Sequence, residues 1–183
     1  MNQYLWNEEL GLFDDYNWRS GQKRNAVTAA ALSALAAGIA TEAQAASTAD
    51  RVRSDLLAGG GLLNTSIVTG EQWDAPNGFA AVQWIATVGL RQYHQDGLAR
   101  EIANRWLQTV SDVYRRQGRL AEKYDVVNAA QGGGGGYPLQ SGQGWTASIT
   151  SALLRTFPEL SEHASGTPDT CRASNASSLP ASE

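Results

Sequence analysis

The stretch Glu71-Gln72-Trp73-Asp74-Ala75-Pro76-Asn77-Gly78 leads directly into residues 79–93, which carry no charged side chain before Arg91. Apolar side chains lie on more than one face of that second segment: Phe79, Val82, Ala86, Leu90 and Tyr93 on one, and Trp84, Ile85 and Val88 on another. A helix that is apolar all round is buried in a protein core. The sequence therefore predicts a buried helix that is entered through a polar, tryptophan-bearing loop.

Two kinds of helix are predicted to alternate along the chain. Residues 23–40, 79–93 and about 146–157 are apolar on most sides, whereas residues 43–58 and 96–117 carry charged side chains on one face. The second pattern is typical of an outer, half-solvated helix. Alternation of buried and exposed helices predicts an all-α fold of the toroid type, in which inner helices line the centre and outer helices shield them. The 183 residues provide about two and a half helical hairpins.

The three irregular loops that precede the buried helices, 11–22, 64–78 and 120–145, are expected to lie on the same rim of such an array. They carry tryptophans, acids and amides: Trp18, Trp73, Trp145, Asp14, Asp15, Asp74, Asn77, Glu122 and Asp125. An aromatic face stacks on the apolar C–H side of a sugar ring, while carboxylates and amides bind its hydroxyls. The loops therefore predict one carbohydrate site at one end of the helices.

The motifs in these loops resemble those of the α,α-trehalases, glycoside hydrolase family 37. The stretch 72–78 is similar to the signature heptad of that family. Glu122-Lys123-Tyr124-Asp125-Val126, the glycine run 132–136 with Tyr137, and Gly144-Trp145-Thr146 resemble its next two motifs in the same order. The resemblance covers roughly residues 2–157 and corresponds to the C-terminal portion of a much longer enzyme.

This resemblance implies about half of an (α/α)6 toroid, formed by residues 1–159 and followed by a low-complexity tail, 160–183, that is expected to be disordered. It also implies inverting hydrolysis of α,α-trehalose to two glucose molecules, without a cofactor. Glu122 takes the position of the general base, and the substrate-binding positions are Gln72, Trp73, Asp74, Asn77, Tyr124 and Trp145. An inverting enzyme also needs a protonated acid about 6.5–9.5 Å from the base. Trehalases take that acid from an upstream motif that has no counterpart in this sequence.

Several of these residues also fit a purely structural interpretation. Glu122 beside Lys123 is compatible with a solvated surface, and Trp73 with the core. Asp74 or Asn77 would equally cap the helix that follows. The glycine run fits either a loop that closes over substrate or a flexible linker, and it lacks the Lys-Ser/Thr of a phosphate loop.

The sequence also departs from the family pattern. Gly136 stands where trehalases usually carry a glutamate, and Phe79 and Ala81 stand where tryptophan and proline are usual. The alternative hypothesis is therefore a degenerate, non-catalytic trehalase-like module without activity of its own. A different (α/α)6 glycosidase is a third hypothesis, which the heptad disfavours.

Composition narrows the range of partners. A formal net charge of −4 and a pI near 5.2 argue against nucleic acid and anionic membranes as partners. The charge-free apolar segments 25–41 and 75–90 are too short to span a membrane. His94 and His163 lack metal-ligand neighbours, so no metal site is expected. The expected partners are trehalose or glucose, with the N-terminal half of such an enzyme or a second copy of the chain. The sequence leaves a periplasmic and a cytoplasmic location equally open.

Overall fold

The computed structural model describes residues 2–141 and 144–161, and most of its regular structure is helical, as the sequence predicts. Within these residues no strand is longer than three residues. The helices are α1 (Asn2–Leu5), the 3-10 helix η1 (Ala29–Ala31), α2 (Leu32–Ala36), α3 (Glu42–Asp55), α4 (Ala80–Gln92), α5 (Asp96–Gln117) and α6 (Gly144–Thr156). The strands are β1 (Trp6–Asn7), β2 (Leu12–Phe13), β3 (Tyr16–Asn17), β4 (Gln22–Lys23), β5 (Leu57–Ala58), β6 (Gly61–Leu62), β7 (Asn77–Phe79), β8 (Lys123–Asp125) and β9 (Ala130–Gln131).

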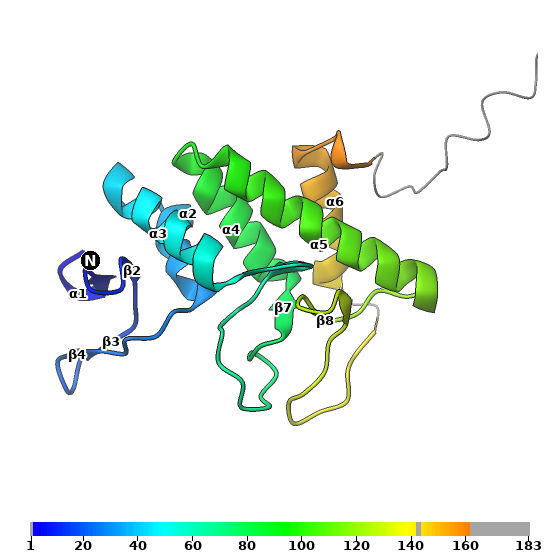
Figure 1. Cartoon of the computed structure of the whole chain (residues 1–183), viewed down its shortest axis with the longest axis horizontal. Helices are drawn as coiled ribbons and strands as arrows, with labels where there is room; N and C mark the ends of the chain where they lie inside the picture. Colours follow the sequence, from blue (N-terminus) through cyan, green and yellow to red (C-terminus); the bar gives the residue numbers. More distant parts are fainter. Residues whose placement is uncertain (1, 142–143, 162–183) are drawn as a thin grey trace, which may run out of the picture.

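The helices form two layers with α4 at the centre. Helix α4 packs between α2 and α6, and α5 crosses both α4 and α6 in the second layer, beside α3 (Figure 1). The apolar side of α5 is buried, including Ile102, Trp106 and Val113, while its arginines and acids face outward. The core therefore lies between the two layers.

Local sequence signals set the helix ends. Thr41 caps α3 through a reciprocal pair of hydrogen bonds with Gln44, a capping box. Helix α5 ends at Gly118, which has the left-handed φ of 69° that glycine adopts without strain. These boundaries agree with the predicted ones to within a few residues.

The first predicted helix, 23–40, is wrong in extent, because only residues 29–36 are helical. The backbone upstream of them is paired elsewhere: β4 pairs with β3, and Thr28 forms a β-bridge with Thr65. The amide of Ala29 donates to the carbonyl of Asn64 at 2.8 Å. The alanine-rich pattern therefore predicted helix where tertiary pairing imposed a non-helical backbone.

Two further expectations need correction. Helix α4 is not buried all round, since Val88 is 37 % exposed and Trp84 is only half-buried. Leu160, expected to begin the tail, is 3 % exposed and belongs to the core cluster. The remainder of that predicted tail, 162–183, lies outside the described residues.

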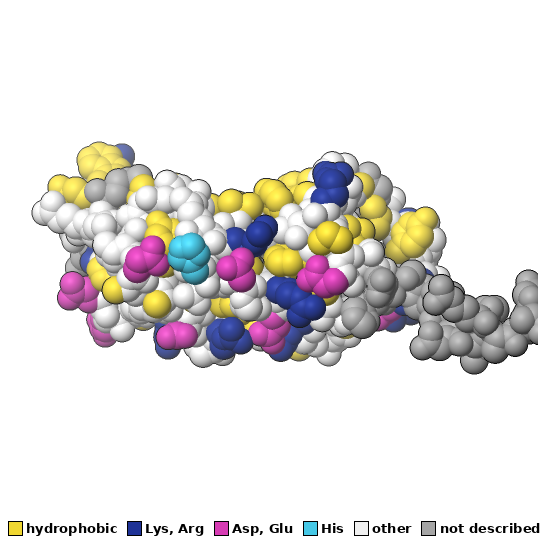
Figure 2. Space-filling view, turned by 90° about the horizontal axis from the view of Figure 1, so that it is seen from above, with side chains coloured by type: hydrophobic (Ala, Val, Ile, Leu, Met, Phe, Trp, Pro, Cys, Tyr) yellow, Lys and Arg dark blue, Asp and Glu magenta, His cyan; other side chains and the backbone are white. Residues whose placement is uncertain are grey.

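The long irregular segments leave the helices on one side, and the short turns 37–41 and 93–95 lie on the other (Figure 1). The turn side carries charged side chains of both signs among hydrophobic ones (Figure 2). The ion pairs Arg91–Asp96, at 3.2 Å, and Arg100–Glu159, at 2.9 Å, lie near these turns. The loops that carry the candidate residues therefore share one end of the molecule, as the alternation of helices predicts.

A three-stranded antiparallel sheet, in the order β7-β8-β9, ties two of these loops together at the start of α4. Gly78 is the middle residue of the edge strand β7 and lies opposite Tyr124 of the central strand β8. A Cβ on Gly78 would lie 2.7 Å from both the carbonyl oxygen of Leu62 and Cγ1 of Val126. The side chain of Gln83 in α4 holds the backbone of Leu62 in place. Its Oε1 accepts a hydrogen bond from the Leu62 N–H, and its Nε2 donates one to the Leu62 carbonyl, each at 2.8 Å.

We expect Gly78→Ala to destabilise the protein by about 1–3 kcal/mol, because the added methyl group overpacks a site with no free volume. Gly97 in α5 is the matched control, since nothing lies within 4 Å of a Cβ added there. Gly97→Ala should be neutral or stabilise by about 0.5–1 kcal/mol, because alanine restricts the unfolded chain more than glycine does. Urea denaturation of both variants measures the difference. Equal stability of the two would show that the β6–β7 approach is looser than described.

Candidate carbohydrate site

The two faces of the β7–β8 pair have different roles, because side chains alternate along a strand. Tyr124 points into the core: it is 0 % exposed and its ring packs edge-on against Trp106 at 5.0 Å. Its hydroxyl accepts a hydrogen bond from the amide of Ala121, and burial raises its pKa. Tyr124, expected from the resemblance to bind substrate, therefore lies in the core rather than in the wall of a site.

The other face carries an aromatic cluster. Phe79 is fully buried, and Trp73 stacks on it with ring centroids 4.1 Å apart and planes inclined by 16°. Trp145, at the start of α6, packs edge-on against the same ring at 5.9 Å. Both tryptophans keep part of their surface open, at 46 % and 38 % exposure respectively. Phe79 thus positions two partly exposed tryptophans that come from loops 72 residues apart in the sequence.

Glu122 is not a solvated surface residue, because it is only 6 % exposed. Its Oε1 accepts a hydrogen bond from the Tyr137 hydroxyl at 2.6 Å. Its Oε2 is buried and has no hydrogen-bond partner among the described residues. A buried carboxylate oxygen without a partner is costly, and such atoms in proteins concentrate where a ligand or water binds.

The Tyr137 hydroxyl connects Glu122 with Gln72. The hydrogen bond to Glu122 is the main cause of a raised pKa for Tyr137, with burial and the nearby negative charge also contributing, and the Gln72 side chain acts in the opposite direction. Oε1 of Gln72 is also buried without a partner among the described residues. Tyr137 was not among the predicted site residues, although its position directly after the glycine run is part of a quoted motif.

The glycine run is a packed segment rather than a linker. The side-chain amide of Asn77 donates to the carbonyl of Gly133 at 2.7 Å and accepts from its N–H at 3.2 Å. The Lys123 ammonium donates to the carbonyl of Gly134 at 2.8 Å. A Cβ on Gly135 would lie only 2.7 Å from Cβ of Gln72, so the two loops pack at backbone distance.

Asn77 and Asp74 use their polar atoms to shape these loops. The Asn77 amide also donates to the carbonyl of Gln72 at 3.2 Å, and the residue is 3 % exposed. Oδ2 of Asp74 accepts from the Thr69 hydroxyl and from the amides of Thr69, at 2.6 Å, and Glu71, at 3.4 Å. The Thr69 hydroxyl is the main cause that holds the pKa of Asp74 below its usual value. Asp74 therefore stays ionised and is unsuited to donate a proton.

Asp125 has a similar structural use. Its Oδ1 accepts from the amides of Val127, at 3.0 Å, and Asn128, at 2.8 Å, and its Oδ2 accepts from the Asn128 side chain. These bonds close the turn between β8 and β9. Both Asp74 and Asp125 therefore use their carboxylates to hold loop backbone.

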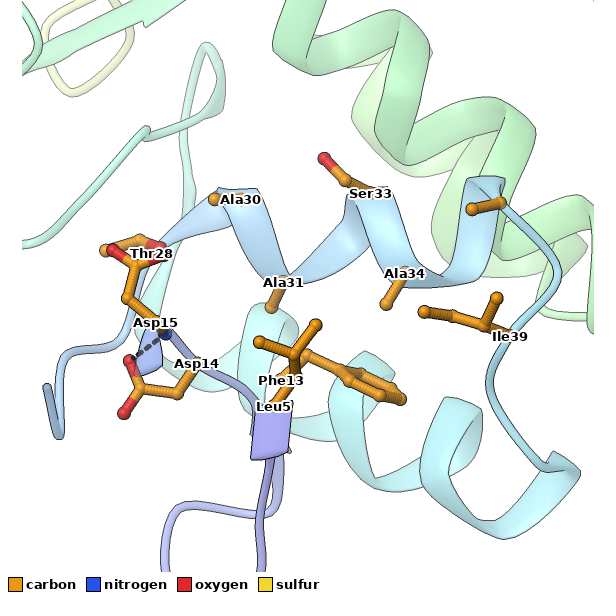
Figure 3. Close-up of a pocket in the computed structure, with 11 residues that line it drawn as sticks. Leu5, Phe13, Asp14, Asp15, Thr28, Ala30, Ala31, Ser33, Ala34 and Ile39 are labelled. Carbon is orange, nitrogen blue, oxygen red and sulfur yellow. Dashed lines mark hydrogen bonds between the residues drawn. The ribbon is translucent and has the colours of Figure 1, made fainter. Parts of the chain in front are cut away.

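The residues of loop 11–22 form a separate region. A cavity of about 310 Å³ lies between this loop and α2, with alanines of η1 and α2 on one wall and Asp14 and Asp15 at one end (Figure 3). The Asp14 carboxylate accepts bonds from Asn7, Asp15 and Asn25, so its charge stabilises the loop itself. Trp18 is 76 % exposed. No contact described for Asp14, Asp15 or Trp18 reaches Glu122, so the structure does not join them to its site.

No group of three or more potential metal ligands of the His, Cys, Asp and Glu types occurs within residues 2–141 and 144–161. In the same residues no helix is both long and apolar enough to cross a membrane.

Comparison with known proteins identifies the family. The Trehalase family model matches residues 1–158. The chain is 48 % identical over 159 residues to a periplasmic trehalase of Xanthomonas campestris pv. campestris, and 47 % identical to one of Xanthomonas axonopodis pv. citri. Each match covers 86 % of this chain but only 28 % of the relative. This chain thus spans less than a third of the length of these relatives.

Solved structures show the same fold. Neutral trehalase from Saccharomyces cerevisiae matches with a TM-score of 0.76 and 28 % identity, over 90 % of this chain and 30 % of that one. A GH63 mannosylglycerate hydrolase from Thermus thermophilus, solved with glucose, matches with a TM-score of 0.58 at 21 % identity, over 83 % of this chain and 36 % of that one. The second likeness shows the fold alone. With the family model matched over nearly all of the described residues, this chain belongs to the trehalase family.

Proposed function

We propose that this chain supplies the general-base part of a site that hydrolyses α,α-trehalose to two glucose molecules with inversion. The observation that carries the proposal is Glu122, a buried carboxylate with one oxygen held by Tyr137 and the other unpartnered. Relatives nearly half identical to it are trehalases by name. Since the chain covers 28 % of their length, the proposed protonated acid comes from residues other than those described.

In the proposed reaction Glu122 removes a proton from a water molecule through Oε2. The water oxygen then attacks the anomeric carbon from the side opposite the leaving glucose. The glycosidic C–O bond breaks, and the acid supplied from outside this chain protonates the leaving oxygen. Inversion follows because bond formation and bond breaking occur on opposite faces of the sugar.

The other residues divide into contact and support roles. Trp73 and Trp145 expose ring surface that would stack on a glucose ring, and the unpartnered Oε1 of Gln72 would accept a bond from a sugar hydroxyl. Asp74 and Asn77 act indirectly in this proposal, because their polar atoms already hold the loops together. Tyr124 supports β8 from the core.

We further propose that residues 1–159 form the C-terminal part of an (α/α)6 toroid, with α2, α4 and α6 as inner helices. Two observations support this proposal: the TM-score of 0.76 with the yeast enzyme, and the partly exposed apolar side chains of α4. Those side chains would pack against the remaining helices of the ring, or against a second copy of this chain.

A non-catalytic module remains the second candidate, and Gly136 favours it. Nothing lies within 4 Å of a Cβ added at Gly136, so packing does not exclude the glutamate that trehalases usually carry there. The chain therefore lacks an expected sugar contact for which it has space. Activity measurements separate the two candidates.

The isolated chain is expected to release no measurable glucose from trehalose, because general acid catalysis is worth about 10²–10⁴-fold. Addition in trans of the N-terminal portion of a Xanthomonas relative should restore turnover, and Glu122→Gln should abolish it. Glucose release measured by a coupled assay gives both results. Turnover by the isolated chain that Glu122→Gln removes would show that these residues suffice. Full activity of the complemented Glu122→Gln variant would exclude Glu122 as the base.

Trp73→Ala should weaken glucose or trehalose binding roughly two- to tenfold, since an aromatic contact is worth about 0.5–1.5 kcal/mol. Trp18→Ala is the matched control, because Trp18 is more exposed and lies outside the cluster around Phe79. Saturation-transfer NMR on the sugar protons measures the binding. An equal loss in both variants, or none in Trp73→Ala, would argue against stacking on Trp73.

A further inference from the structure

Lys123 is a buried lysine that the proposed reaction does not use. Its side chain is 0 % exposed, although lysine is almost never fully buried unless it is paired. No ion pair joins it to a carboxylate within residues 2–141 and 144–161. Its ammonium instead donates to the Gly134 carbonyl at 2.8 Å and lies 5.3 Å from the centre of the Tyr137 ring. A charged group so placed costs desolvation energy that simple packing does not require.

Both contacts of the Lys123 ammonium are with one short segment. Gly134 belongs to the glycine run, and Tyr137 follows it by three residues. A cation over an aromatic face within about 6 Å is attracted to it, more strongly where water is excluded. Lys123 thus restrains both the backbone of the run and the ring whose hydroxyl bonds Glu122.

In the part of the chain that the structure describes, the other backbone anchors of the glycine run bind Gly132, Gly133 and Gly135. The amide of Gly132 donates to the Lys123 carbonyl at 3.1 Å, Asn77 binds Gly133, and the amide of Gly135 donates to the Gly70 carbonyl at 3.1 Å. Gly136 has open space around its Cβ position. Within the described residues, the Lys123 ammonium therefore contacts both a fixed glycine, Gly134, and the ring of Tyr137.

We propose that Lys123 is a positioning residue: its ammonium holds Gly134 and the Tyr137 ring, so that the Tyr137 hydroxyl binds Oε1 of Glu122 and leaves Oε2 to the reacting water. The assignment of Oε2 to the reacting water rests on the proposed function. The contacts of Lys123 with Gly134 and Tyr137 lie within this chain and can be tested without any sugar.

The test follows the Tyr137 hydroxyl by NMR of ¹³Cζ-tyrosine, with the Tyr137 signal among the six tyrosines identified by Tyr137→Phe. In the wild type the Glu122 hydrogen bond raises the pKa of Tyr137 above 10.0. In Lys123→Met we expect this pKa to fall towards 10.0, because the hydroxyl leaves the carboxylate. Loss of the positive charge alone would raise the pKa of a tyrosine. The direction of the change therefore separates repositioning from a direct charge effect, and an unchanged or higher pKa would overturn the proposal.

Lys23 provides a matched control, because it is the other lysine of the chain and its ammonium also donates to a backbone carbonyl, that of Trp6. Lys23→Met should leave the Tyr137 titration unchanged. Lys123→Arg, which keeps the charge and donors, should retain more of the raised pKa than Lys123→Met. If Lys23→Met lowers the pKa of Tyr137 as much as Lys123→Met does, a specific role for Lys123 is refuted.

Reductive methylation of the wild-type protein tests the enclosure of the Lys123 ammonium, which these contacts require, if Lys123→Met fails to fold. Because the chain has two lysines, peptide mass spectrometry can measure the methylation rate of each one separately. Lys123 should react much more slowly than Lys23, since its ammonium is enclosed. Equal rates in the folded protein would contradict the proposed placement.

Catalysis provides a separate measurement in the complemented enzyme. Lys123→Met and Tyr137→Phe should lower kcat more than they raise KM, and Lys123→Arg should lower kcat less than Lys123→Met, because a misplaced base affects the chemical step more than sugar binding. A change confined to KM would assign Lys123 to substrate binding and overturn the positioning role. If complementation gives no turnover at all, the proposed function fails, whereas the Tyr137 titration still decides the contacts of Lys123.

Discussion

The antiparallel pairing of β7 with β8 is the constraint on which the candidate site depends. It joins the loop before α4 to the segment after α5, so that Asn77, Gly78 and Phe79 lie opposite Asp125, Tyr124 and Lys123. The pairing is possible because Gly78 has no side chain where Leu62 and Val126 approach. It also brings Lys123 and the glycine run beside the loop before α4, where Asn77 binds Gly133. The contacts of the glycine run with Gly70 and Gln72 then add to this pairing.

Several polar side chains of the rim loops form hydrogen bonds with loop backbone, so their polar atoms are already occupied and few are left to bind a ligand. Asn77, Asp74 and Asp125 each bind several backbone groups, which a loop with little regular structure needs in order to satisfy its buried N–H and C=O groups. Glu122 and Gln72 differ, because each has a buried side-chain oxygen without a partner. In the proposed function, that contrast separates the residues that hold the loops from those that meet water and sugar.

The glycines of the run 132–136 differ in how closely they are packed. Its residues approach Asn77 and Gln72 at distances that a Cβ would not tolerate at positions 132 and 135. Gly136 is free of such contacts, so its glycine is not required by packing. A segment that looks uniform in the sequence therefore contains glycines with a structural role and one without.

The sequence by itself determined the helical class, the positions of α3, α4, α5 and α6, and the gathering of the polar loops at one end. Helix periodicity, Gly118 and the Thr41 capping box are local signals, and they act in the same way in any fold. The sequence motifs also predicted Glu122, Trp73 and Trp145 as site residues, whereas their contacts with Tyr137 and Phe79 come from the structure. Only the tertiary structure decided that residues 23–28 are not helical, because Lys23 pairs with Tyr16 and Thr28 pairs with Thr65. It also decided that Tyr124 faces the core while its neighbour Lys123 faces the glycine run. Strand alternation sends adjacent residues to opposite faces, and only the packing of β8 against α5 determines which face is buried.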